Sequence, residues 1–205
     1  MDRFRLLQLP SLALQAVLQF LDPYELEILR SIIGQVIEKQ KVIKRLMIRE
    51  NLTEKDMTWI LDNLTITDYC VCYVMTSPDF GYKFKTYPRH FSLHGSHWFK
   101  LDDLIAAAKS TKVIRLHDSH LDNKDIDAFM KLWTSGNFMT LRYLEVESRN
   151  LNQRGQILGR NLIQPWNDEV NWDAAENGVR IRSDDGIKAL MEYSSSDHYF
   201  TLKVL

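Results

Sequence analysis

Residues 11–21 carry so many apolar side chains that, as a helix, they require burial on nearly every side. At the helical period, Ser11, Gln15 and Gln19 form one narrow polar stripe, and the positions around it are apolar. A helical module of roughly 45 residues can cover only one face of such a helix, because small domains bury a low fraction of their surface. The sequence therefore predicts that this helix either docks onto another protein or packs against the rest of its own chain.

Two more helices are expected before residue 50. Asp22, Pro23 and Glu25 supply the N-cap, the first-turn proline and the acidic residue of a capping box. A third helical run, over about residues 36–47, follows Gly34, a residue type common at helix ends. The basic residues between positions 39 and 49 fit the solvated side of this amphipathic helix better than a nuclear address or a phosphate-binding surface.

The apolar and proline residues of the first two helices stand in the order and spacing of the F-box pattern: Leu9-Pro10, Leu14, Val17-Leu18, Leu21-Asp22-Pro23, Glu25-Leu26, Leu29 and Ile32. The stretch from residue 4 to about residue 36 therefore resembles an F-box. The resemblance implies a three-helix module that binds a Skp1-type adaptor within a cullin-based ubiquitin ligase. It also implies which residues contact the adaptor or form the core beneath those contacts: Leu9, Pro10, Leu14, Val17, Leu18, Leu26 and Leu29.

The second part of the chain alternates predicted helices and strands. Leu52-Thr53 and Leu121-Asp122 each place a polar cap after an apolar residue, and an amphipathic helix follows both. Residues 179–182 and 187–191, joined by a turn, predict a β-hairpin, and residues 199–205 a final strand. Two segments keep the spacing of a leucine-rich repeat: Leu141, Leu144, Val146, Arg149 and Leu151, and the degenerate copy Ile114, Leu116, Ser119 and Leu121.

The region from residue 52 to about residue 191 resembles the type 2 F-box-associated domain of nematode F-box proteins. The likeness is carried by residues 61–69, 76–80, 121–133, 141–144 and 181–186. Family members usually carry a longer connection between the two modules, so a shortened member is expected. The expected fold class is α+β or α/β. An N-terminal three-helix F-box, residues 1–50, precedes a small, irregular leucine-rich-repeat-like α/β domain, residues 51–205, that ends in a β-hairpin.

Histidine and cysteine pairs raise the question of a metal site or an enzyme. The pairs are His94 and His97, His117 and His120, and Cys70 and Cys72. Structural zinc needs four ligands that converge, and the cysteines are expected to be small core residues instead. The sequence contains no glycine-framed nucleophilic serine, no H-E-x-x-H and no phosphate-binding loop. It therefore predicts no catalytic residue, no metal and no cofactor, and a metal-dependent enzyme remains only a third hypothesis.

Aromatic residues are candidates for target recognition, since Trp and Tyr dominate binding hot spots. Trp98 and Trp133 lie near apolar helical runs and are expected in the core. Trp166 and Trp172, in the polar stretch of residues 164–178, are the weak candidates for substrate binding.

These features predict an adaptor rather than an enzyme. A formal net charge of -1, with both signs interspersed, gives no reason to expect nucleic acid or a membrane as partner. The low cysteine content favours a reducing intracellular compartment, the cytoplasm or the nucleus. The first hypothesis is the substrate-recognition subunit of a Skp1-cullin-F-box type ubiquitin ligase, with a Skp1-like adaptor and an unknown protein substrate as partners. The alternative is a stand-alone repeat-type protein-interaction module without a ligase role.

Overall fold

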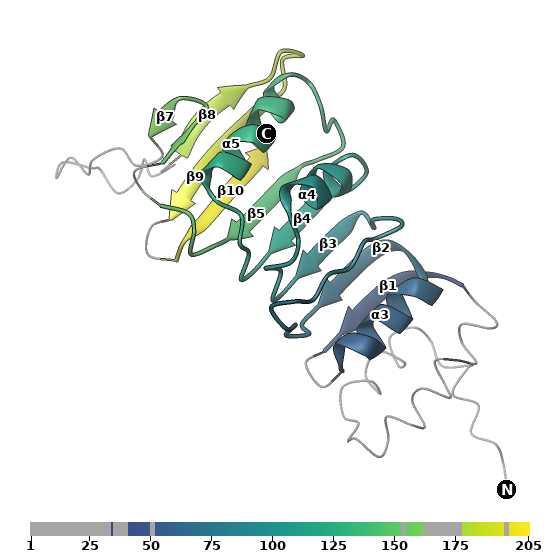
Figure 1. Ribbon diagram of the computed structural model, residues 1–205. Coiled ribbons are helices and arrows are strands. Elements are labelled where there is room, and N and C mark those ends of the chain that lie inside the picture. The colour runs from purple at the N-terminus through teal and green to yellow at the C-terminus, as the bar shows by residue number, and fades with distance from the viewer. Residues whose placement is uncertain (1–33, 35–40, 50–51, 153–154, 162–177, 195–196) are drawn as a thin grey trace, which may run out of the picture.

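One mixed sheet forms the centre of the protein in the computed structural model, which describes residues 34, 41–49, 52–152, 155–161, 178–194 and 197–205 (Figure 1). In spatial order its strands are β1 (Val42–Ile48), β2 (Thr65–Cys72), β3 (His90–Leu93), β4 (Val113–Leu116), β5 (Tyr143–Glu147), β10 (Tyr199–Val204), β9 (Lys188–Ser194) and β8 (Gly178–Arg182). Neighbours from β1 to β5 are parallel, and those from β5 to β8 are antiparallel. A separate small ribbon consists of β6 (Gln156–Ile157) and β7 (Arg160–Asn161).

The described helices all lie on one face of the sheet (Figure 1). They are α3 (Glu54–Asn63), α4 (Leu101–Ala108) and α5 (Asn123–Thr134). Each connects two neighbouring parallel strands, which cannot be joined by a tight turn. Within the described residues, no helix is long and apolar enough to cross a lipid bilayer.

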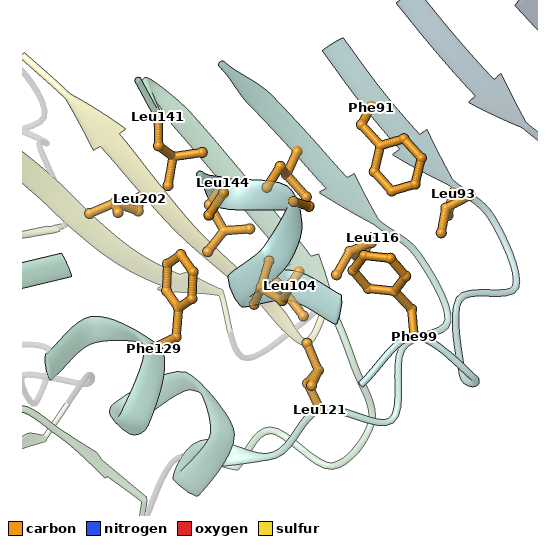
Figure 2. Close-up of a cluster of buried hydrophobic side chains, with 14 of the residues drawn as sticks. Phe91, Leu93, Phe99, Leu104, Leu116, Leu121, Phe129, Leu141, Leu144 and Leu202 are labelled. Atoms are coloured by element: carbon orange, nitrogen blue, oxygen red, sulfur yellow. The ribbon is translucent and has the colours of Figure 1, made fainter. Parts of the chain in front are cut away.

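Two rows of apolar side chains run across the sheet beneath the helices, and we call this side the covered face. The register aligns Cys70, Phe91, Ile114, Leu144 and Leu202 in one row, and Cys72, Leu93, Leu116, Val146 and Phe200 in the other. None of these side chains is more than 2% exposed. Leu104 of α4 and Phe129 of α5 point toward them (Figure 2). The rows form the core, and they fix the strand register because a slip of one residue would turn them outward.

Aromatic rings take the place of a helix in the connection between β2 and β3. Phe84 meets Phe91 edge-on, with ring centroids 4.9 Å apart, and Phe80 meets Trp98 at 5.0 Å. Trp98 is 8% exposed and Trp133 is 2% exposed, which confirms that both are core residues.

Helices α3 and α5 begin where the sequence predicts. The Thr53 hydroxyl accepts a hydrogen bond from the Asp56 amide at 3.2 Å, and the Asp56 carboxylate accepts from the Thr53 amide at 3.2 Å. Asp122 and Asp125 form the same reciprocal pair at the start of α5, with distances of 3.0 Å and 3.1 Å. Both capping boxes satisfy backbone N–H groups that have no partner inside the helix.

The expected third helix, over residues 36–47, is wrong in its second half, because Val42–Ile48 form strand β1. This strand pairs in parallel with β2, and Ile48 lies opposite Cys72 with 1% of its surface exposed. A short apolar run that begins with β-branched residues fits the period of a helix and that of a strand. Pairing with β2 favours the strand here, because it buries Ile48. Over the residues that the structure describes, there is therefore no N-terminal three-helix F-box. The two helices expected to begin at Ser11 and Asp22 lie outside the described residues.

The expected fold class needs a second correction in the arrangement of the sheet. Strands β8 and β9 form the predicted hairpin, and β10 is the predicted final strand. These strands belong to the central sheet, because β10 lies between β5 and β9, where Phe200 and Leu202 complete the two buried rows. One continuous, mostly β structure replaces the expected small domain with a terminal hairpin. The leucine-rich-repeat-like character and the division at residue 50 stay predictions, although β1 joins the sheet before that boundary.

Candidate functional site

The described elements leave the second face of the sheet uncovered, and we call it the open face. Because side chains alternate along a strand, the residues between those of the covered face point to it. They form three rows: Arg45, Tyr69, His90, Val113, Tyr143 and Lys203; Met47, Val71, Ser92, Arg115, Glu145 and Thr201; and Tyr73, His94, His117, Glu147 and Tyr199. A sheet face that carries such aromatic and polar side chains is the best candidate for a binding surface in the described residues.

Aromatic and imidazole rings stand side by side on the open face of β2, β3 and β4. The rings of Tyr73 and His94 stack with centroids 4.3 Å apart, and His94 stacks on His117 at the same distance. In the first row, the rings of Tyr69 and His90 are 6.2 Å apart and tilted. Such rings offer large, rigid contact surfaces with polar edges.

A hollow of about 180 Å³ lies between the Tyr69–His90 and Tyr73–His94 ring pairs. Its floor includes Val71 and Ser92, which are only 3% and 9% exposed although they belong to the open face. Arg115 lines the hollow on the β4 side. The hollow therefore combines a small floor, ring-shaped walls and a guanidinium group at one end.

The glutamates of β5 are held by their neighbours on the open face. The Tyr143 hydroxyl donates to Glu145 at 2.5 Å, and the Tyr199 hydroxyl donates to Glu147 at 2.9 Å. The Nδ1 atom of His117 lies 3.0 Å from the same Glu147 oxygen that accepts from Tyr199. A network of this kind fixes side-chain positions before a ligand arrives.

The charged side chains of the open face change sign between neighbouring strands. Over β1–β4, the charged residues of the three rows are Arg45 and Arg115, and Arg49 follows at the end of β1. We call this the basic half. Next to it, Glu145 and Glu147 lie on β5, and we call this strip the acidic half. Beyond it, Glu192 on β9 is paired with Lys203 of β10 at 3.0 Å. The charge of the open face therefore changes from basic to acidic between β4 and β5.

Two tyrosines of the acidic half predict how stability depends on pH. Burial, followed by the hydrogen bond to a glutamate, raises the pKa of Tyr143 and of Tyr199 to about 12. The folded protein thus keeps protons that the unfolded chain, with tyrosine pKa values of about 10, has lost. The stabilisation is complete below about pH 10 and is lost as the pH rises toward about 12.

We therefore expect the free energy of unfolding to fall more steeply above about pH 10 in the unchanged protein than in a Tyr143→Phe, Tyr199→Phe double variant. Urea unfolding at a series of alkaline pH values measures both slopes. Equal slopes would contradict the raised pKa values.

The histidine and cysteine pairs singled out in the sequence do not converge on one point. Cys70 and Cys72 are buried on the covered face, which confirms them as small core residues. His94 and His117 stack on the opposite, open face. Within the described ranges, no group of three or more His, Cys, Asp or Glu side chains is placed to hold a metal ion. The pairs therefore supply no ligand set for zinc.

The binding residues expected from the sequence lie outside the described residues. They are Leu9, Pro10, Leu14, Val17, Leu18, Leu26 and Leu29 for the adaptor, and Trp166 and Trp172 for the substrate. The open face was not predicted from the sequence, although a signal for it exists. An aromatic ring follows the last buried residue of three successive strands, in Cys72-Tyr73, Leu93-His94 and Leu116-His117. An alignment of these three strand ends identifies the ring row.

Comparison with known families gives one match. Residues 79–146 match the family described as F-box associated. The matched segment contains β3, α4, β4 and α5 and nearly all of β5, and it lies inside the region that resembles such a domain. Neither the curated proteins nor the solved structures include one that matches the chain. At this coarse level, the match supports a role in substrate recognition associated with an F-box.

Proposed function

We propose that the chain is a substrate-recognition adaptor of a Skp1-cullin-F-box type ubiquitin ligase. The match of residues 79–146 to the F-box-associated family carries this proposal, together with the F-box order of residues in the segment from residue 4 to about residue 36. The two features occur in the order expected for such proteins. The nematode origin implied by the resemblance belongs to the same proposal.

The adaptor end is the apolar segment near the N-terminus. Because the polar stripe of this expected helix is narrow, its apolar side chains cover more than one face, which is all that a small module can bury. Leu14, Val17 and Leu18 belong to this excess apolar surface. Complete burial of each such side chain contributes about 1.5 to 3 kcal/mol, so three of them offset much of the cost of association. A Skp1-like protein is the proposed partner for this surface.

The target end is the open face of the sheet. Its strands are held in register by continuous backbone pairing and by the buried rows on the covered face. A rigid surface loses little conformational freedom when it binds, which favours affinity. The proposed role is to raise the effective concentration of a bound protein near the ligase. The adaptor itself transfers nothing, so we propose no catalytic residue.

The proposed place of work is inside the cell, in the cytoplasm or the nucleus. Cys70 and Cys72 are free thiols buried in the core. Their hydrogen-bonded contact and their burial raise the pKa of the Cys70 thiol well above its usual value. Neither cysteine forms a disulfide, which fits a reducing compartment.

Copurification with a Skp1-like protein tests the adaptor role. We expect Leu18→Asp to abolish copurification, because it places a charge in the proposed apolar contact. Gln19→Asp is the matched control, since it adds the same charge to the expected polar stripe and should leave binding within about twofold. Circular dichroism checks that both variants keep their folded content. Equal binding by the Leu18→Asp and unchanged proteins would favour the alternative, a protein-interaction module without a ligase role.

A further inference from the structure

We infer that the basic half of the open face binds an extended acidic segment of a protein, with one aromatic side chain of that segment seated in the hollow between Tyr69 and Tyr73. This inference names the class of target and rests on the proposed function. It depends on three observations: the charges along β1, the size and walls of the hollow, and the position of the acidic half.

The first observation is a pair of exposed arginines beside the rings. Arg45 and Arg49 alternate with Leu46 and Ile48, whose side chains pack on the covered face. The register places Arg45 next to Tyr69, and the strand end places Arg49 next to Tyr73. Both are exposed, and neither makes an ion pair with the described residues. Two guanidinium groups, one on β1 and one just after it, can therefore donate hydrogen bonds to carboxylates of a partner.

The second observation is the hollow itself. Its volume of about 180 Å³ is close to the roughly 150 Å³ of a protein cavity known to accept a benzene ring. Val71 provides an apolar floor, and the rings of Tyr69, Tyr73 and His94 provide walls against which an aromatic side chain can stack. The space suits one ring, which is the usual anchor of a binding hot spot.

The third observation decides between a protein and a nucleic acid. A bound nucleic acid would carry phosphates across the open face, and Glu145 and Glu147 lie directly beside the basic half. Like charges repel, so a uniformly negative chain fits only part of this surface. The Nε atom of Arg115 also lies 3.8 Å from a carboxylate oxygen of Glu145. Arg115 is therefore less available to a ligand than Arg45 and Arg49. A segment with acidic residues confined to one end matches both halves.

Selection from a library of short random peptides tests the inference on the immobilised full chain, without a Skp1-like partner. We expect enriched peptides to carry an aromatic residue beside several Asp or Glu residues. Fluorescence anisotropy then measures the affinity of one enriched, labelled peptide and of labelled oligo(dT). The Arg45→Glu, Arg49→Glu variant should weaken peptide binding at least about tenfold, and so should Ser92→Phe, which fills the hollow.

Lys109→Glu, Lys124→Glu is the matched control, because it makes the same change in net charge at exposed positions near the ends of α4 and α5. It should leave the affinity within about twofold. Failure to enrich any peptide, a consensus without acidic residues, equal loss in the control variant, or tighter binding of oligo(dT) would each overturn the inference. Because no adaptor is present, these outcomes are separate from a failure to copurify with a Skp1-like protein.

Discussion

Replacing Phe129 by alanine is expected to lower the free energy of unfolding by about 3 to 5 kcal/mol, the range found for large aromatic residues in protein cores. Phe129 is fully buried on α5 and stacks on Phe138, with ring centroids 4.9 Å apart and planes 6° from parallel. It points toward the buried rows of the sheet (Figure 2). The variant removes its contacts with both and leaves a cavity that rigid strands cannot close. Urea unfolding followed by circular dichroism measures the loss.

Met139→Ala is the matched control for this experiment. Met139 follows Phe138 in the chain but is 66% exposed, so its truncation removes little buried surface. We expect a change below about 0.5 kcal/mol. A loss at Phe129 no larger than that at Met139 would show that α5 does not pack on the sheet as described.

The parts of the fold that depend on local signals could be predicted from the sequence. Both capped helices begin at the expected residues, Thr53 and Asp122, because a capping box is complete within one turn of chain. The strands around the turn at residues 183–186 were predictable for the same reason. Their position in the sheet was not, because β10 inserts between β5 and β9, and only long-range pairing determines that order.

The open face depends almost entirely on such long-range pairing. Tyr69, His90 and Arg115 are far apart in the chain and become neighbours only through the register of β2, β3 and β4. Apolar periodicity, which guided the sequence analysis, identifies buried residues and says little about a half-buried face of rings and charges. The ring after each strand was the available signal, but its use requires the strand ends to be aligned first.

The prediction of a helix over residues 36–47, where β1 lies, was wrong in a way that bears on function, because Arg45 and Arg49 of the basic half lie in and just after this strand. In a helix, the charged side chains of residues 39–49 would be distributed over its solvent-exposed surface. As a strand in register with β2, residues 42–48 place Arg45 beside Tyr69, and Arg49, which follows the strand, lies beside Tyr73. The same basic residues would thus form only a solvated surface in a helix, whereas in strand β1 they form a defined edge for binding.

Ile48→Ala is expected to lower the free energy of unfolding by about 2 to 5 kcal/mol. Ile48 is 1% exposed in the sheet core, and its carbonyl accepts a hydrogen bond from the Tyr73 amide at 2.8 Å. Truncation removes the apolar contacts that hold this end of β1 against β2. Because β1 is an edge strand, part of the cavity can close, which favours the lower end of the range.

Val42→Ala separates the strand from the expected helix. Val42 begins the same strand but is 53% exposed, so its truncation should cost less than about 1 kcal/mol. A helix over residues 36–47 reverses the order, since it places Val42 on the apolar side and ends before Ile48. Urea unfolding of the two variants therefore decides between the conformations. A larger loss of unfolding free energy at Val42 than at Ile48 would show that residues 42–48 do not form β1 in the sheet. Arg45 and Arg49 would then not be placed beside the hollow.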